Sequence, residues 1–325
     1  MEGDVVLPGY TVVRRLGSGD SAMWLAREDA TGEPVTLRFI AAANAGVRQR
    51  LVAALPTLQS IDHPHIAPLF DVVETPQGYV AVLGAAEGGS LAAIVAQHGT
   101  LTFGQVITAC APIADGLAEF HQHGIVHGAI TLDDIVFTLD GRPMIVGVGL
   151  LQAGAEFPSA RGSLAPEVLS GAPPSPKADT YSLATVAVVA MTGYLPQRPL
   201  VIDGLPPSAQ AVLERALGQP PMRPDAGTLA NALYTIADPE PVELATEQVE
   251  GTGSLPTVTE PLAGTAPGGD ISSYMRESVP GRRARRSAES ADADAPVEEP
   301  AAEPDAPAGR RSARPAEGRR TATDR

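Results

Sequence analysis

Short apolar segments separated by turn-forming residues fill the first quarter of the chain. Their lengths, and their content of β-branched and aromatic residues, predict β-strands. The glycine-containing turn 17–21 separates the first two strands. The expected strands are 10–16, 22–28, 34–40, 67–74 and 78–83, with a helix over 44–60 between the third and the fourth.

Apolar residues recur at helical spacing in the second part of the chain, which predicts helices over 103–123, 179–192, 207–217 and 226–237. Between the first two helices, two short apolar strands flank the polar turn 138–142, and this pattern predicts a β-hairpin within 125–149. Strands come first and helices follow, so the pattern indicates an α+β fold.

The composition changes near Pro239 to Ala, Pro, Gly, Glu, Ser and Arg without apolar periodicity. Such a segment cannot bury enough apolar surface to offset the entropy lost on ordering it. We therefore expect a folded domain over residues 1–240 and a disordered tail over residues 241–325.

Charge and residue usage exclude several classes of function. The net charge of −15 argues against non-specific nucleic-acid binding. The single cysteine, Cys110, excludes an intramolecular disulfide or a cysteine metal site, and its apolar helical surroundings predict a core position. No apolar run is long enough to span a bilayer, and acidic Glu2 and Asp4 make the N-terminus unlike a signal peptide, so we expect a cytoplasmic protein.

The hairpin segment carries the most informative motif. It reads His127-Gly128-Ala129 before the first strand and Gly147-Val148-Gly149 after the second. Together with Asp134 between them, these positions resemble the His-Arg-Asp, the downstream Asn and the Asp-Phe-Gly of protein kinases. Other landmarks of that family follow in the same order: 62–66 for the His-Pro-Asn-Ile turn, 87–91 for the hinge between the lobes, 165–167 for Ala-Pro-Glu, then Asp179 and Arg223.

On these motifs the chain is identified as a degenerate, pseudokinase member of the bacterial Ser/Thr protein kinase family. The resemblance implies a bilobal protein kinase-like fold. Its N-lobe would be a small antiparallel β-sheet over about residues 7–84, and its C-lobe would be mainly helical over about residues 90–238.

The resemblance also shows which chemical groups are missing. The proton-accepting Asp of active kinases is replaced by Ala129, and the magnesium-binding Asp by Gly147. The Glu that pairs with the phosphate-binding Lys corresponds to Ala54, and Pro56 is expected to kink or interrupt that helix. No catalytic residue is therefore expected, whereas His127, a packing residue in the family, is retained.

Part of a nucleotide cleft is still present by this comparison. Gly17 and Gly19 match a shortened glycine-rich loop, and Arg38 stands where the phosphate-binding Lys would be. Arg38 can contact phosphate or can be a solvated strand residue, and an arginine does not substitute conservatively for a lysine. Asp134 replaces the magnesium-binding Asn, and its alternatives are a metal ligand or a cap of its own loop.

Packing around Leu16, Thr36, Leu83 and Val136 would decide the shape of that cleft. Hinge backbone groups can bind adenine whatever their side chains, so the sequence leaves ATP binding open. We expect that no cofactor is required and that magnesium binding would depend on Asp134 alone.

Three retained residues are interpreted as architectural anchors of the C-lobe. Glu167 and Arg223 match a carboxylate and an arginine that pair in the family, and Asp179 matches an Asp that opens a buried helix. A buried charge without its partner is costly, so keeping both members of the pair indicates that the C-lobe core is maintained. A further helix that the family usually has, αG, is expected to be deleted between residues 193 and 206.

The tail offers two candidate contacts. Thr257 and Thr259 lie in an exposed segment that another Ser/Thr kinase could phosphorylate, and a forkhead-associated domain could read the phosphothreonine. The basic cluster from Arg282 to Arg286 either contacts acidic lipid or an acidic partner, or is a solvated part of the tail.

Two functions from different classes follow. The first is a non-catalytic signalling scaffold or regulator that works through protein-protein contacts, and the second is a weak or atypical ATP-binding Ser/Thr kinase that uses Arg38 and Asp134. A third interpretation is an adaptor whose working part is the tail. The replaced catalytic groups favour the first.

Overall fold

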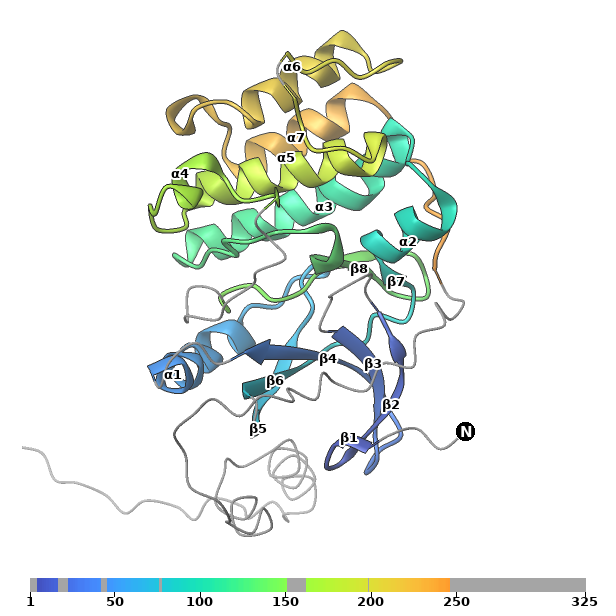
Figure 1. Ribbon diagram of the computed structural model, residues 1–325, viewed down its shortest axis with the longest axis vertical. Coiled ribbons are helices and arrows are strands. Elements are labelled where there is room, and N and C mark those ends of the chain that lie inside the picture. The colour runs from blue at the N-terminus through green and yellow to red at the C-terminus, as the bar shows by residue number, and fades with distance from the viewer. Residues whose placement is uncertain are drawn as a thin grey trace, which may run out of the picture. The chain divides into compact units, whose positions relative to one another are not determined.

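The computed structural model describes residues 5–16, 23–41, 46–75, 78–150, 162–197 and 199–245, and all structural statements concern these residues. They form a six-stranded antiparallel sheet with one helix, joined to a mainly helical part (Figure 1). The expected α+β, two-lobed architecture, an antiparallel sheet followed by a mainly helical part, is confirmed. No helix in the described part is long and apolar enough to cross a membrane.

The N-terminal part contains β1 (Val5–Leu7), β2 (Tyr10–Arg15), β3 (Met23–Glu28), β4 (Pro34–Ala41), α1 (Gly46–Ser60), β5 (Leu69–Thr75) and β6 (Gly78–Leu83). The following part contains β7 (Gly89–Ser90), α2 (Leu91–His98), α3 (Phe103–Gln122), β8 (Ile135–Phe137), β9 (Pro143–Ile145), α4 (Pro166–Leu169), α5 (Pro176–Thr192), α6 (Pro207–Ala216) and α7 (Ala226–Ile236). Two 3₁₀ turns, η1 (Leu132–Asp134) and η3 (Pro220–Met222), complete it.

The six-stranded sheet runs in the order β1-β2-β3-β4-β6-β5 and has two apolar faces. Side chains alternate between faces along a strand. Val35 and Leu37 of β4 belong to a small core on one face, whereas Ile40 belongs to the main core on the other. Thr36 and Arg38 share the face of Ile40, which is the face toward the helical part.

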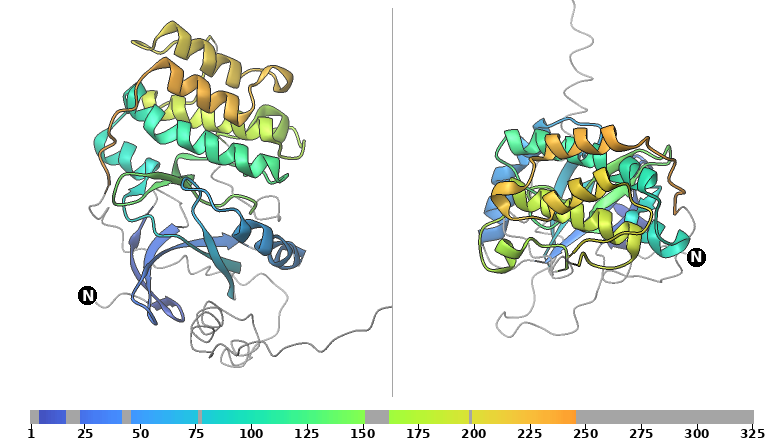
Figure 2. Two further views of the ribbon diagram at one scale, coloured as in Figure 1. Left: turned by 180° about the vertical axis from the view of Figure 1, so that it is seen from behind. Right: turned by 90° about the horizontal axis from the view of Figure 1, so that it is seen from above.

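The helical part is organised around α3, which packs against α5, α7 and β9 (Figures 1 and 2). Thr102 and Gln105 begin α3 with a reciprocal capping box. Ser175 caps the start of α5, and Gly193 ends it in the left-handed conformation, at φ +77°. Between Gly193 and α6, the described residues form no helix, in line with the expected deletion.

The predicted hairpin is present as β8 and β9, and β7 pairs with β8 to complete a three-stranded sheet. Thr138 closes the turn by accepting the Arg142 N–H on its hydroxyl at 3.1 Å. The parallel bridge from Ile66 to Ile145 links this small sheet to the chain that follows α1.

Of the kink or interruption expected at Pro56, the interruption is wrong, because α1 continues through it to Ser60. A proline removes one helical hydrogen bond. The turn beyond it is held by tertiary packing instead, since Leu58 is buried in the main core. The sequence patterns also missed the short elements β1 and α4.

Residues 238–245, called the strap below, run back from the end of α7 along α3. The Glu240 N–H donates to the Gly104 carbonyl at 3.0 Å, and the Thr108 hydroxyl donates to the Glu240 carbonyl at 2.6 Å. The Gln105 amide donates to the Pro241 carbonyl at 3.1 Å. A Cβ at Gly104 would contact the Glu240 side chain, so a larger residue there would require that side chain to move.

The strap ends beside β7. Ala245 is buried, and its N–H donates to the Gly88 carbonyl at 3.1 Å. His98, at the end of α2, lies 3.5 Å from the Glu243 carboxylate. Backbone hydrogen bonds thus hold the strap against the helical part, although its sequence has no apolar periodicity. Residues 246–325 of the predicted tail lie outside the described residues.

Candidate functional site

The centre of the site is an ion pair between the two lobes. Arg38 on β4 donates from Nη1 to Oδ1 of Asp134, at the end of η1. Only 10% of the Arg38 side chain and 1% of the Asp134 side chain are exposed. The expectation of a solvated Arg38 is therefore wrong, since its neighbour across the interface is a carboxylate and the pairing allows the charge to be buried.

The second oxygen of Asp134 is also engaged. Oδ2 accepts the Thr131 N–H at 2.7 Å and the Thr131 hydroxyl at 2.8 Å. This arrangement is a capping box at the start of η1. Of the two roles weighed for Asp134, the structure contains the loop cap, together with the ion pair to Arg38.

Gly147 provides the space for the Arg38 guanidinium. A Cβ at Gly147 would lie 2.7 Å from Nη1 of Arg38, closer than side chains approach. Its φ is +85°, a backbone conformation that a residue with a side chain adopts only with strain. The position of the magnesium-binding Asp is therefore filled by a cation from β4.

The segment before η1 keeps the hydrogen bonds that hold its backbone, but it has no side chain that could transfer a proton. The buried Asp179 carboxylate accepts the His127 N–H at 2.9 Å and the Gly128 N–H at 2.6 Å. His127 donates from Nε2 to the Val146 carbonyl at 2.9 Å and accepts the Ala129 N–H on Nδ1 at 3.3 Å. Ala129 is buried, and its methyl group can neither accept nor donate a proton.

The connection between the lobes, residues 84–88, carries a second internal contact. The Ala86 N–H donates to the Thr36 hydroxyl oxygen at 3.0 Å, and both residues are fully buried. Sequence patterns assigned Thr36 to packing and did not indicate this bond, because it depends on how closely β4 approaches the connection.

The other predicted cleft residues with a described position are apolar and packed. Leu83 and Val136 are buried in the main core, and Ala54 on α1 packs against it half-buried. Ala54 has no polar group with which Arg38 could pair. Gly17 and Gly19 lie outside the described residues, as do Thr257 and Thr259 and the cluster 282–286.

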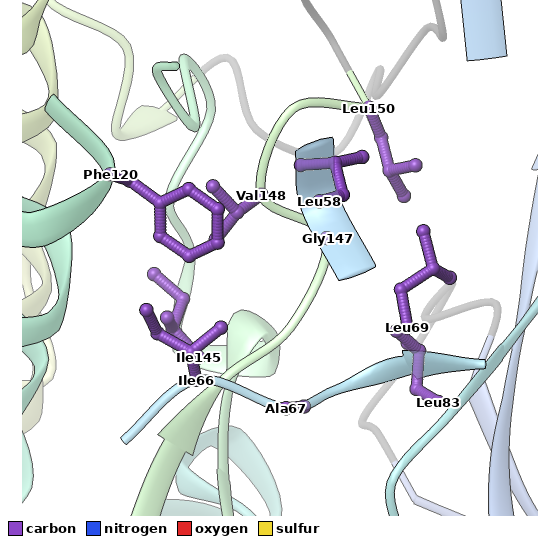
Figure 3. A pocket seen from close by; sticks show the side chains of 10 residues that line it. All are labelled: Leu58, Ile66, Ala67, Leu69, Leu83, Phe120, Ile145, Gly147, Val148 and Leu150. Carbon is purple, nitrogen blue, oxygen red and sulfur yellow. The ribbon is translucent and has the colours of Figure 1, made fainter. Parts of the chain in front are cut away.

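A small cavity of about 20 Å³ lies behind this site. Figure 3 shows its lining of aliphatic side chains and one phenylalanine: Leu58, Ile66, Ala67, Leu69, Leu83, Phe120, Ile145, Gly147, Val148 and Leu150. The volume corresponds to about one water molecule, and all of its lining side chains are apolar. None of these side chains could bind a polar ligand or take part in a reaction.

Glu167 and Arg223 meet in the helical part. Arg223 donates to the two carboxylate oxygens of Glu167 at 2.5 and 2.9 Å, and its guanidinium lies 4.8 Å from the centre of the Tyr181 ring. The hydrogen bonds from Arg223 hold the pKa of Glu167 below its ordinary value. The pair ties α4 to the segment before α7.

Magnesium does not fit this arrangement. Both oxygens of Asp134 have donors, and one of these donors is a cation that repels a metal ion. Within the described ranges, no group of three or more His, Cys, Asp or Glu side chains could hold a metal. Carboxylates are the usual protein ligands of Mg²⁺, and the family's second carboxylate is missing at Gly147.

The family model for the protein kinase domain matches residues 10–201. The chain is 27% identical over 201 residues to the SNF1-related protein kinase catalytic subunit alpha KIN12 of Arabidopsis thaliana, covering 59% of this chain and 41% of that protein.

Bacterial relatives are similar to the same extent. Serine/threonine-protein kinase PknD of Mycobacterium tuberculosis is 27% identical over 208 residues, which cover 60% of this chain and 31% of PknD. Serine/threonine-protein kinase PkaB of Streptomyces coelicolor is 26% identical over 207 residues, which cover 58% of this chain and 49% of PkaB. The matched part thus spans less than half the length of each of these three relatives.

Proposed function

Since this chain belongs to the protein kinase domain family, we propose that it keeps the bilobal scaffold, has lost phosphoryl transfer, and acts in signalling by binding other proteins. The observation that carries this proposal is the buried ion pair of Arg38 and Asp134 in the space left by Gly147. The two charged groups that would contact phosphate and metal neutralise each other.

The size of the catalytic loss supports the same conclusion. Removing one preorganised electrostatic partner typically lowers a rate by about 10²–10³. Here the base position is Ala129, the magnesium carboxylate position is Gly147, and the partner of the phosphate-binding residue is Ala54. Losses within one site do not simply multiply, but few contributors to phosphoryl transfer are left.

The test is a phosphotransfer assay on the full chain, with magnesium and then manganese, on itself and on general protein substrates. The control is Asp134→Ala, which removes the carboxylate that could hold a metal. We expect equal, background-level transfer from both proteins. Transfer by the wild type that is lost in a folded Asp134→Ala protein would overturn the proposal and establish the atypical kinase.

We place the partner contact of this scaffold in the tail threonines. Phosphorylation of Thr257 or Thr259 by a Ser/Thr kinase would create a ligand for a forkhead-associated domain. The test phosphorylates the full chain with a purified kinase and measures binding of such a domain, with Thr257→Ala and Thr259→Ala as variants and Thr265→Ala as the matched control. Binding that survives the double variant would exclude these sites.

A further inference from the structure

We propose that Thr36 excludes adenine nucleotides from the cleft. Its hydroxyl takes the hydrogen bond that an adenine ring would make at the connection between the lobes. This inference rests on the proposed function and adds that the scaffold works without bound nucleotide. It is carried by three contacts between the lobes.

The first contact satisfies the backbone donor that faces the cleft. The Ala86 N–H donates to Thr36 Oγ1 at 3.0 Å, and neither residue is exposed. A purine could reach this amide only by displacing the hydroxyl. Because a buried amide without an acceptor is unfavourable, the bond is held in place until a ligand replaces it.

The second contact closes the other end of the cleft. Thr36 and Arg38 are two positions apart on β4, so their side chains lie on the same face. Arg38 reaches Asp134 and also approaches the Val146 carbonyl at 3.5 Å. One strand thus supplies both a hydroxyl at the purine position and a cation at the metal position.

The third contact joins the end of β2 to the start of α2. The Ser90 N–H donates to the Leu16 carbonyl at 3.3 Å. Arg14 on β2 donates from Nη2 to the Glu87 carbonyl at 2.5 Å. The strand that precedes the glycine-containing turn is therefore bonded directly to the lobe connection and to the chain just beyond it.

The experiment measures adenosine binding to the full chain by calorimetry and thermal shift. Adenosine lacks phosphates and needs no metal, so only the purine position is probed. We expect no saturable binding by the wild type. Thr36→Ala removes the hydroxyl and a methyl group, and we expect it to bind adenosine saturably, with an affinity at least tenfold above the detection limit of the titration.

Two variants are matched controls. Thr36→Ser keeps the acceptor, and Thr36→Val keeps the volume without it, so neither should gain adenosine binding. Hydrogen exchange of the peptide covering 84–88 gives a readout without ligand: the Ala86 amide should exchange at the wild-type rate in Thr36→Ser and at least tenfold faster in Thr36→Val. Unchanged protection in Thr36→Val would overturn the role of Thr36.

The outcomes separate this inference from the proposed function. Saturable adenosine binding by the wild type, without phosphotransfer, overturns the self-occupied cleft and leaves the non-catalytic scaffold intact. A folded Thr36→Ala protein that binds no adenosine also overturns it. Phosphotransfer that depends on Asp134 overturns the proposed function itself.

Discussion

Removing the Asp134 carboxylate should destabilise the protein strongly. In Asp134→Ala, the Arg38 guanidinium, with 10% of its side chain exposed, loses its carboxylate, and the N–H and hydroxyl of Thr131 lose their acceptor. Leaving one member of a buried ion pair alone costs about 3–5 kcal/mol. We therefore expect a loss of about 3–5 kcal/mol in the free energy of unfolding.

A second substitution tests whether the charge or the loop cap dominates. Asp134→Asn keeps an oxygen for Thr131 but turns an NH₂ group, which cannot accept, toward Arg38. Because the loop cap is kept, we expect a smaller loss of about 1.5–3 kcal/mol, the range of hydrogen bonds to charged groups. Combining it with Arg38→Met leaves neither charge unpaired. The double variant should therefore lose less than the sum of the single variants, by about 0.5–3 kcal/mol.

The assay is urea unfolding of the full chain, followed by the fluorescence of Trp24. This is the only tryptophan, and it is 2% exposed on β3, next to the strand that carries Arg38. Asp134→Ala should shift the transition to lower urea. An unchanged midpoint, or losses in the double variant that simply add, would refute the coupling between the two residues.

Three further predictions follow from contacts away from the cleft. Arg223 lowers the pKa of Glu167 below its ordinary value of 4.5, so this carboxylate stabilises the fold above that pH and the contribution is lost as the pH falls through the lowered pKa. Glu167→Gln should flatten the dependence of unfolding midpoint on acid pH, and a parallel curve would contradict this. Burial raises the pKa of Cys110 to about 12, so its thiol should stay unreactive toward a disulfide reagent at pH 8 until urea is added, and prompt reaction of the native protein would show otherwise. A chain truncated after Ala237 should melt at a lower temperature than one truncated after Ala245, because it lacks the strap; equal melting temperatures would deny the strap any stabilising role.

Local patterns were sufficient for most of the fold. β6 was predicted with its observed bounds, and the observed bounds of β4 and α3 differ from the prediction by a single residue at the end. In each, the apolar period alone distinguishes strand from helix. The short elements β1 and α4 have too few residues to show a period, and the strap has none, because its order comes from backbone hydrogen bonds.

The contacts of the site were harder to predict. Arg38 and Asp134 are separated by 96 positions, and each had two reasonable roles when considered alone. Considered together, the substitutions did indicate the ion pair. Relative to the family pattern, a carboxylate is lost at Gly147, which leaves space for a large cation, and another carboxylate is gained at Asp134, next to that space. The Thr36 bond gave no such signal, because a threonine in a strand is usually explained by its strand preference.

The strap gives the domain a mechanical property. Ala245, the last residue that the structure describes, is bonded to Gly88 beside the connection between the lobes and lies beyond the end of α7 in the chain. A force applied at Ala245 would therefore act on this connection before it acted on α7. The same connection is bonded to Thr36, two positions from Arg38 on β4.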